Sequence, residues 1–360
     1  MLDKSPDNIT KPFVSVIVPC YNEEAILKTN LEIIRSFLES RSYKYLWEII
    51  VINDGSKDNT REIAEEYARQ FKEVRVINHP SNLNLGHALQ TGFRNAKGEI
   101  IVVLDVDLSY SVDHIEKLAD KLLEKSADIV IASPYMKGGK VTAVPFSRRI
   151  MSNWVNKFMS IAAQDKYYTF TGMVRAYRSE FIRTLNLKTK DYEVNPEIIY
   201  KGMILRARII EIPAHLDWTE QNKFSDKRKS SLRVLRSFFS GIMSGFIFRP
   251  YIFFLAIGSV LMLLSLYELI WLLFDTLKDI HKFQILPTNF DNLFSYSLTL
   301  QFRKNPQSFI VGGITFIAAM QFLSLGFLSL QSKRYFEELF HLGTALKKQN
   351  EKKQTSDEQF

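Results

Sequence analysis

Two aspartates separated by one residue are the chemically most informative feature of this sequence. Asp105 and Asp107 stand in the segment Leu-Asp-Val-Asp-Leu-Ser, which continues the apolar run 100–104. If that strand continues, side chains at i and i+2 point to the same side, so both carboxylates can approach one cation. Hard divalent cations take oxygen ligands and bridge phosphates. The pair therefore indicates a metal site for a diphosphate, although a solvated turn has the same spacing.

Polar residues also follow the first apolar run of the chain. Residues 18–24 read Val-Pro-Cys-Tyr-Asn-Glu-Glu, where a dinucleotide-binding domain would carry G-x-G-x-x-G. This difference argues against NAD or FAD as a cofactor. Tyr21 can stack on a base, and Asn22 or Glu23 can hydrogen-bond to a ribose or a base. The plainer alternative, which is compatible with the first, is that Asn22 caps a helix.

A third polar segment, Ile-Asn-Asp-Gly-Ser-Lys-Asp, spans residues 52–58. Asp54 lies where a base or ribose can be read, and Gly55 permits a close turn. Ser56 and the residues after it open a helix. Taken alone, this segment is only a strand-to-helix turn.

The elements that must position these residues alternate between strands and helices up to about residue 212. The expected strands are 13–18, 47–52, 74–78, 100–104 and 128–132. The expected helices are 23–39, 58–71 and two that begin at Gly86 and Ser111. Asp58 is the expected N-cap of the second helix. Continuous Val/Ile runs between amphipathic helices favour an α/β fold with a mostly parallel sheet covered on both faces. The site is then expected at the carboxyl ends of the strands.

Two apolar segments follow the α/β region. Residues 251–274 and 309–330 are long enough to cross a bilayer, and the first contains one acid, Glu268. The alternative is a pair of buried core helices. Basic residues cluster before the first segment and after the second, so the positive-inside rule predicts cytoplasmic ends and an outside loop at 275–308.

Two further stretches have the pattern of helices that lie in the headgroup layer. Within 229–250, apolar residues from Leu235 to Phe246 fall on one helical face and Arg233 with three serines on the other. A second pattern runs from Phe146 to Ile161, with Trp154 on its apolar side. For both, an ordinary helix packed on its own domain is the alternative.

Composition restricts the remaining classes of function. The chain has 360 residues, a formal net charge of +8 and one cysteine, Cys20, which excludes an internal disulfide framework and a multi-cysteine zinc site. Because the basic residues gather beside the apolar segments, we expect lipid headgroups rather than nucleic acid as their partner. Residues 1–12 lack a signal-peptide core, and 347–360 are expected to be disordered.

In this order, the motifs resemble family 2 glycosyltransferases of the GT-A fold. The matching stretches are V-P-C-Y-N-E-E, N-D-G-S-K-D, N-L-N-L-G-H-A, L-D-V-D-L-S and the segment ending in R-A-Y-R at residues 175–178. With the two apolar segments, the layout is similar to polyprenyl-phosphate glycosyltransferases such as dolichol-phosphate mannose synthases. The resemblance implies a metal-dependent, inverting transfer of a sugar from a nucleotide-sugar, GDP-mannose or a UDP-hexose, to a polyprenyl phosphate at the cell membrane.

The resemblance also implies roles for individual residues. The implied catalytic residues are Asp107, Arg175 and Glu197, and the implied ligands of Mg²⁺ or Mn²⁺ are Asp105 and Asp107. The implied donor-binding residues are Pro19, Tyr21, Asn22, Glu23, Asp54, Gly55, Ser56, Gly86, Asp105, Lys227 and Arg228. Among these, Arg175 would face phosphate charge, and Lys227 or Arg228 would close on the phosphates.

The sequence departs from the family pattern in three places, one of which is the segment 136–144, a loop with its own sequence character. Ser133-Pro134-Tyr135 stands where relatives often have Ser-Arg, so one phosphate-binding arginine is missing, and Arg148 or Arg149 is a candidate substitute. Ser109 stands where some relatives have a metal-binding glutamine. These departures leave the donor sugar open.

The predicted organisation is an N-terminal tail (1–12), a GT-A domain (13–228), an amphipathic helix (229–250), a first span (251–274), a loop (275–308), a second span (309–330) and a cytoplasmic tail (331–360). Two alternatives stay open. One is a processive polysaccharide synthase, although such enzymes usually carry a Q-x-x-R-W motif that is absent from this sequence. The other is a catalytically inactive membrane scaffold. A homo-oligomer is compatible with the sequence.

Overall fold

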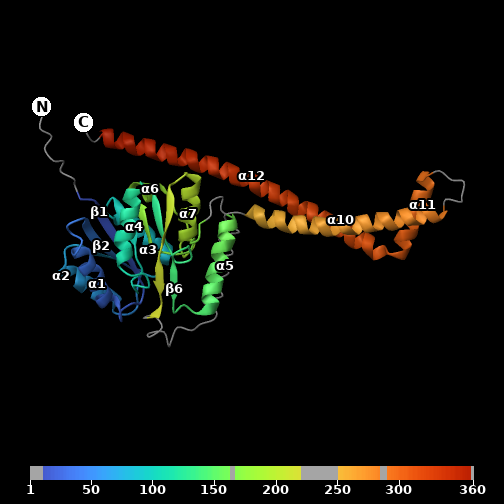
Figure 1. Ribbon diagram of the computed structural model, residues 1–360. Coiled ribbons are helices and arrows are strands. Elements are labelled where there is room, and N and C mark those ends of the chain that lie inside the picture. The colour runs from blue at the N-terminus through green and yellow to red at the C-terminus, as the bar shows by residue number, and fades with distance from the viewer. Residues whose placement is uncertain (1–10, 163–166, 220–249, 284–289, 358–360) are drawn as a thin grey trace, which may run out of the picture. The chain divides into compact units, whose positions relative to one another are not determined.

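The computed structural model describes residues 11–162, 167–219, 250–283 and 290–357 (Figure 1). The chain divides into two compact units, one made of residues 1–245 with 340–360 and the other of residues 246–339. The predicted amphipathic helix at 229–250 lies outside the described residues except for its last residue, Pro250, which begins a later helix.

A seven-stranded sheet forms the centre of the first unit. Its strands are β1 (Phe13–Cys20), β2 (Leu46–Asn53), β3 (Val74–Asn78), β4 (Ile100–Val103), β5 (Ile129–Ser133), β7 (Arg175–Arg178) and β8 (Ile209–Pro213). They lie in the order β3-β2-β1-β4-β7-β5-β8. Only β7 runs against the others, because it pairs antiparallel with both β4 and β5. The predicted mostly parallel α/β sheet is confirmed, and the reversed β7 is an addition to it.

Helices cover both faces of this sheet. One face packs on α1 (Leu27–Glu39), α2 (Thr60–Gln70) and α4 (Asp113–Glu124), and the other on α3 (Leu85–Asn95), α6 (Ser179–Thr184) and α7 (Val194–Ile204). Alternate residues of β1 enter the two cores: Val16 belongs to the first and Ile17 to the second. A strand buried on both sides explains why the strand sequences are continuous Val/Ile runs.

Two predicted helix starts are wrong by a few residues. The helix expected from Glu23 begins at Leu27, and the one expected from Asp58 begins at Thr60. In both places the polar residues before the helix bond to the neighbouring loop instead of extending the helix. Asp58 still accepts the Thr60 amide at 3.1 Å, although the N-cap position itself is Asn59.

A smaller layer lies beside the carboxyl ends of the main sheet's parallel strands. Strands β6 (Lys140–Thr142) and β9 (His215–Asp217) pair in parallel, and Tyr110 forms an isolated bridge with Leu216 of β9. Helix α5 (Phe146–Ala162) follows β6. These pieces bring residues far apart in the sequence to the segment that follows β4.

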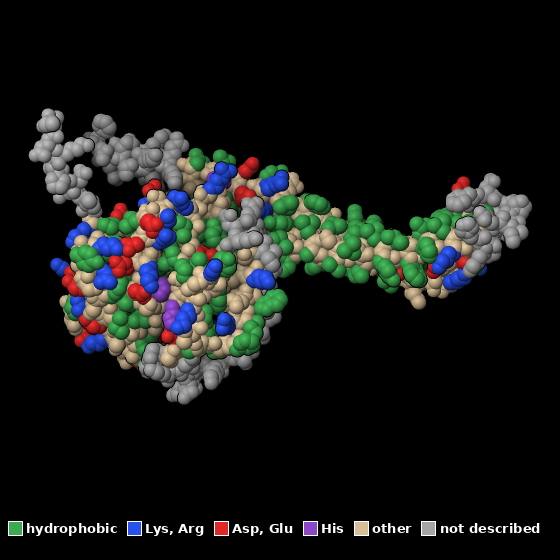
Figure 2. Space-filling view, viewed as in Figure 1, with side chains coloured by type: hydrophobic (Ala, Val, Ile, Leu, Met, Phe, Trp, Pro, Cys, Tyr) green, Lys and Arg blue, Asp and Glu red, His purple; other side chains and the backbone are tan. Residues whose placement is uncertain are grey.

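The second unit consists of long apolar helices. They are α10 (Pro250–Phe283), α11 (Phe290–Lys304) and α12 (Pro306–Asp357), the last of which continues into the first unit. Two stretches, 250–280 and 306–346, have mean hydropathies of 2.1 and 1.8 over their most apolar windows, of which only 11% and 17% is buried. Helices of a soluble core would be mostly buried, so this exposure favours membrane spans over a pair of core helices. Figure 2 shows hydrophobic side chains over much of the visible surface of α10.

Small residues let α10 and α12 approach closely within this unit. A Cβ on Gly258 would lie 2.9 Å from the backbone nitrogen of Leu323, and one on Gly326 would lie 2.7 Å from the Leu255 side chain. Close backbone contact at glycines is the usual way that helices associate in lipid. Three details differ from the sequence expectations: α10 extends to Phe283, the loop contains α11, and the tail is helical to Asp357 rather than disordered.

Candidate active site

The polar segments meet where the sheet's connections diverge. Strand β1 lies between β2 and β4, so the chain leaves β1 toward one side of the sheet and returns, after β3, on the other. Ligands of open α/β sheets bind at such a switch point, beyond the carboxyl ends of the strands. The segments after β1, β2 and β4 all end at this edge, as expected from the sequence.

The loops after β1 and β2 are joined by hydrogen bonds. Asn22 has a positive φ of 57°, its amide donates to the Ser56 hydroxyl at 3.0 Å, and its side-chain oxygen accepts the Lys57 amide at 2.8 Å. The Glu23 amide donates to the hydroxyl of Thr60 at 2.8 Å. Asn22 therefore joins two loops and is not a helix cap, which corrects that interpretation. Tyr21 remains 38% exposed and can still stack on a base.

Asp54 is buried beneath these loops. Its backbone amide donates to the Cys20 carbonyl at 2.9 Å, which ties the end of β2 to the end of β1. The next residue, Gly55, has a φ of 66°, and a Cβ there would lie 2.2 Å from the Ser81 carbonyl carbon. Only glycine fits this turn, for both reasons. Gly55 therefore acts on the site through backbone shape.

The paired aspartates occupy a turn rather than a continuing strand. Strand β4 ends at Val103, Leu108 has a φ of 52°, and its amide donates to the Asp105 carbonyl at 3.2 Å. Alternation along a strand therefore does not align the two side chains, and that expectation from the sequence is wrong. The turn nevertheless keeps the carboxylates close enough for Asp107 to raise the pKa of Asp105.

Electrostatics make the Asp105 carboxylate a suitable partner for a cation. Burial is the main cause that raises its pKa well above the ordinary range, followed by the negative charges of Asp107 and Glu23. No hydrogen bond or ion pair to this carboxylate exists within the described part of the chain. Asp107 is better supported, because it accepts the Ser109 amide at 2.9 Å. A divalent cation would relieve the repulsion between these acids.

The described part of the chain supplies too few ligands to hold a metal without further donors. Among the described residues, no group of three or more His, Cys, Asp or Glu side chains is arranged for metal binding. Mg²⁺ commonly binds through one or two carboxylates together with substrate phosphates and waters. Asp105 and Asp107 fit that donor set, in which a diphosphate brings the remaining oxygens.

A residue that the sequence did not indicate supports this turn. The side-chain amide of Asn30, on α1, donates to the carbonyl of Val106 at 2.7 Å, between the two aspartates. The two residues are 76 positions apart, and an asparagine on a helix has no distinctive pattern. Only the packing of α1 on the sheet brings them together.

An arginine stacked on an aromatic ring is a second element of this region. The Arg148 guanidinium lies 4.1 Å from the centre of the Trp218 ring, a cation–π contact. Desolvation lowers the pKa of Arg148, while Tyr192, Tyr135 and Asp107 act in the opposite direction. Arg148 is therefore close enough to Asp107 to feel its charge, and is one of the two arginines suggested as substitutes for the missing one.

Arg175 lies inside the protein rather than at its surface. It is completely buried in β7, where its guanidinium donates to the carbonyls of Phe170 at 2.6 Å and Asn195 at 3.0 Å. Burial lowers its pKa, and its Nε has no partner among the described atoms. In this structure it supports two backbone segments, and a contact with phosphate stays a prediction.

Glu197 and Gly86 meet at one loop. The Glu197 carboxylate, buried in α7, accepts the amides of Lys188 and Thr189 at 2.9 and 3.0 Å and the Lys201 ammonium at 2.6 Å. Gly86 donates its amide to the Lys190 carbonyl at 2.8 Å, and a Cβ on it would lie 2.5 Å from the Thr189 oxygen. Both residues hold the loop 188–190, so a direct contact of either with the donor stays a prediction.

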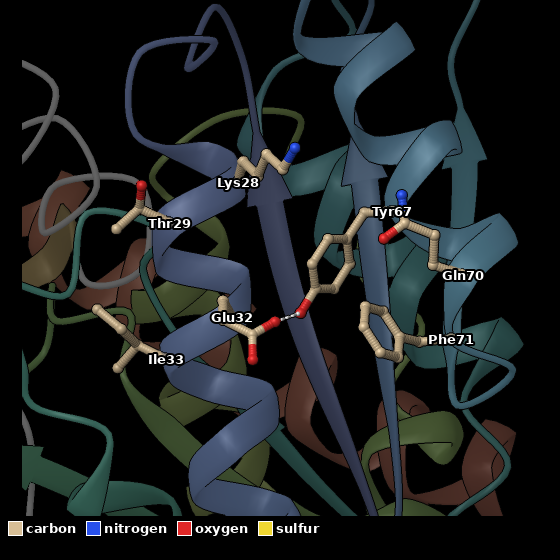
Figure 3. A pocket seen from close by; sticks show the side chains of 7 residues that line it. All are labelled: Lys28, Thr29, Glu32, Ile33, Tyr67, Gln70 and Phe71. Carbon is tan, nitrogen blue, oxygen red and sulfur yellow. Dashed lines mark hydrogen bonds between the residues drawn. The ribbon is translucent and has the colours of Figure 1, made fainter.

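The first unit also has a pocket that lies apart from these residues. A shallow pocket between α1 and α2 is lined by Lys28, Thr29, Glu32, Ile33, Tyr67, Gln70 and Phe71 (Figure 3). The Tyr67 hydroxyl donates across it to Glu32 at 2.6 Å, and it contains none of the predicted site residues. Lys227 and Arg228 lie outside the described residues.

The sheet order, the switch point and the acidic turn after β4 define an α/β domain of the GT-A class. Residues 15–185 match the sequence profile described as glycosyl transferase family 2. This part of the chain is therefore a family 2 glycosyltransferase domain, and the resemblance inferred from the motifs is confirmed.

Individual relatives match the same region. A dolichyl-phosphate beta-glucosyltransferase of Trichomonas vaginalis is 29% identical over 227 residues, which is 60% of this chain and 66% of that protein. A dolichol-phosphate mannosyltransferase of Pyrococcus furiosus is 31% identical over 226 residues, 62% of each chain. The match thus spans slightly less than two thirds of either relative.

Among solved structures, the chain is similar to a mannosyltransferase from Pyrobaculum calidifontis in complex with GDP-Man and Mn²⁺. The TM-score is 0.41 at 17% identity, and the match covers 96% of this chain and 89% of that one. A mannosyl-3-phosphoglycerate synthase from Rubrobacter xylanophilus gives a TM-score of 0.47 at 14% identity, over 65% of this chain and 72% of that one.

Proposed function

We propose that this chain is a membrane-bound glycosyltransferase that moves a sugar from a nucleotide-sugar to a polyprenyl phosphate. The carboxylate pair Asp105 and Asp107, at the switch point of a family 2 domain, is the observation that carries the proposal. The names of the relatives support the acceptor, because both act on a dolichyl phosphate. The two apolar helices support a lipid substrate, since they bring the chain to a bilayer.

On the donor side, Asp105 and Asp107 would hold Mg²⁺ or Mn²⁺ against the diphosphate. A metal held there would neutralise charge on the leaving group. Tyr21 is available to stack on the base, and Asp54 to accept a hydrogen bond from it. The bonds between Asn22, Ser56 and Lys57 fix these loops relative to each other before the donor arrives, which reduces the ordering required on binding.

On the acceptor side, Arg148 is the proposed partner of the lipid phosphate. Its guanidinium is planar and can bind two phosphate oxygens, and stacking on Trp218 restricts its orientation. An acceptor phosphate oxygen would attack the anomeric carbon while the bond from that carbon to the donor diphosphate breaks. The nucleoside diphosphate leaves with the bonding electrons. Because a phosphate monoester is already anionic near pH 7, no strong general base is required, and direct attack inverts the anomeric centre.

Helix α5 is the proposed contact between this domain and the membrane surface. Phe146, Ile150 and Trp154 follow one another at four-residue intervals and are 77%, 40% and 68% exposed. The opposite side of the helix faces the domain, where Met159 enters the core and Asn156 accepts the Phe170 amide at 2.8 Å. The apolar stripe is thus turned outward, and the exposed Arg149 suits anionic headgroups.

One screen tests the reaction. Purified full-length chain is incubated with Mn²⁺, a polyprenyl phosphate and each member of a panel of radiolabelled nucleotide-sugars, and the lipid phase is extracted. Label should appear in lipid with one donor, and EDTA should abolish it. Release of free sugar without lipid labelling would instead indicate a hydrolase. No turnover with any donor would favour the inactive scaffold.

A further inference from the structure

A buried histidine lies directly behind the proposed base-binding aspartate. His79 follows β3, and its Nδ1 lies 2.7 Å from Oδ1 of Asp54. Both side chains are nearly closed to solvent, with 8% and 6% exposed. The other ring nitrogen, Nε2, lies 3.0 Å from the hydroxyl of Thr91 on α3. The three side chains form a line from α3 through the end of β3 to the end of β2.

The hydrogen bonds between Thr91, His79 and Asp54 determine which Asp54 oxygen remains available to a ligand. Oδ1 accepts a second hydrogen bond, from the Leu83 amide at 3.0 Å, so both of its contacts come from the protein. Oδ2 accepts no hydrogen bond from the described residues. It is also not one of the fully buried polar atoms without a partner, so it keeps contact with solvent. One oxygen therefore orients the carboxylate, and the other is left for a ligand.

The hydrogen-bonding capacity of a carboxylate then limits what Oδ2 can bind. An ionised carboxylate only accepts hydrogen bonds. Uracil and guanine carry a hydrogen on a ring nitrogen of their pairing edge. Cytosine and adenine have an unprotonated, accepting nitrogen there. If Oδ2 of Asp54 faces the accepting nitrogen of cytosine or adenine, neither atom has a hydrogen to share, and both stay unpaired. A site built to form that hydrogen bond therefore rejects these two bases strongly.

We propose that His79 is a positioning residue that makes Asp54 select nucleoside diphosphates whose base has a ring N–H. This inference rests on the proposed function, because it assumes that Asp54 faces the donor base. His79 donates from Nδ1 to Asp54, and Thr91 donates to Nε2, which fixes the ring. Without the histidine, the carboxylate rotates and its preference among bases falls.

Nucleotide binding tests this without any turnover. The full-length chain, in detergent with Mn²⁺, is titrated with UDP, GDP, CDP and ADP in a calorimeter. The unmodified chain should bind UDP or GDP at least about tenfold more tightly than CDP and ADP. His79→Leu should reduce that ratio by roughly tenfold, the effect of one hydrogen bond to a charged group. In transfer assays the donor KM should rise while kcat changes little.

Two variants separate positioning from general support. His79→Asn places an amide nitrogen near the Nδ1 position, so it should keep most of the base preference. Thr184→Val removes a buried hydroxyl that donates to the Phe181 carbonyl at 2.7 Å on α6, and it should leave the preference unchanged. If His79→Leu does not fold, Thr91→Val should show a smaller loss of the same ratio.

Each other outcome counts against the inference. Equal weakening of all four nucleotides in His79→Leu would show a structural role only. An unmodified chain that binds all four equally would remove Asp54 as a base reader. An unmodified chain that binds none would overturn the proposed function, and this inference with it.

Discussion

Asp105 is half-buried and Glu197 is buried, and the pKa values of their carboxylates move in opposite directions. Burial raises both pKa values, but the charges of the described residues that act on Asp105 are the negative ones of Asp107 and Glu23. At Glu197, the hydrogen bonds from Lys201 and Thr189 outweigh burial and lower the pKa. Asp105 therefore lacks a positive partner that Glu197 already has. The difference explains why we place the cation at Asp105 and a supporting role at Glu197.

The first prediction concerns the carboxylate pair. Asp107→Asn should reduce transfer by at least about a hundredfold, because it removes one ligand charge where the diphosphate must be neutralised. The unfolding temperature should stay close to that of the unmodified chain. Transfer is measured by lipid extraction over a range of Mn²⁺ concentrations. Glu124→Gln on the outside of α4 is the control, and near-normal activity of Asp107→Asn in saturating Mn²⁺ would remove the metal assignment.

The second prediction concerns Glu197 and pH. Its pKa is lowered on folding, so its contribution to stability is present above the unfolded pKa of about 4.3 and is lost as the pH falls through the folded value. Glu197→Gln should destabilise the chain by about 3 kcal/mol at pH 7, because Lys201 stays buried without its partner. The penalty should shrink below about pH 4. Denaturant unfolding at several pH values measures this.

A double variant distinguishes support from catalysis at the same position. Glu197→Gln with Lys201→Met removes the buried unpaired charge and should recover much of the lost stability. If transfer recovers with it, Glu197 acts by holding the loop. Continued inactivity in a stable double variant would instead support the catalytic role implied by the family resemblance.

The third prediction compares two arginines of β7. Arg175→Ala leaves the carbonyls of Phe170 and Asn195 without donors and opens a cavity, so it should cost about 3 kcal/mol of stability and impair transfer. Arg178, half-buried at the start of α6, should tolerate alanine with little change in either quantity. Unfolding curves and transfer rates are compared for both. Inactive Arg175→Ala with unchanged stability would return Arg175 to the phosphate site.

The sequence predicted those site residues that follow strands in motifs, such as Asp54 and Asp105. It did not indicate contacts that form only through packing. Asn30 reaches Val106 across 76 positions, and Arg148 reaches Trp218 across 70. Neither pair has a local pattern, because the contact arises only when α1 packs on the sheet or when β9 returns beside β6.

At the scale of elements, burial on both faces made the strands easy to predict, whereas their ends were not. The strand that would have to continue through Asp107 to align the two carboxylates stops at Val103. The positive φ of Leu108 and the hydrogen bond from its amide to the Asp105 carbonyl form a turn instead. Helix α11 was missed because its mean hydropathy is low and its polar residues resemble a loop. The direction of the α5 stripe also required the structure, since amphipathic spacing alone does not say which face turns inward.

The fourth prediction tests that stripe. A cysteine in place of Trp154, in a Cys20→Ser background, is labelled with a fluorophore and the chain is reconstituted in bilayers that contain brominated lipid. Its fluorescence should be quenched, because the exposed face of α5 enters the headgroup layer. Tyr43, 70% exposed between α1 and β2, provides the matched control and should not be quenched when labelled in the same way. Equal quenching at both positions, or at neither, would remove α5 from the membrane surface.

At the scale of the whole molecule, the proposed function requires the active site and the lipid substrate to meet on one side of a bilayer. A polyprenyl phosphate presents its phosphate at headgroup level, and nucleotide-sugars are made in the cytosol. Two membrane-spanning helices would return the chain to the side from which it started. The basic residues that flank the outer ends of the spans favour the cytosol for that side.

The fifth prediction is therefore a topology with the α/β domain inside and the segment between the spans outside. Lys72→Cys reports on the domain, since its side chain is 92% exposed and lies between α2 and β3, and Asn305→Cys reports on the segment between α11 and α12. Both are made in a Cys20→Ser background and expressed in intact bacterial cells. An impermeant thiol reagent should label Asn305→Cys only, and permeabilisation should expose Lys72→Cys. The opposite pattern would overturn the orientation and with it the cytosolic donor, whereas two sites that label only after lysis would mean that the helices do not cross the membrane.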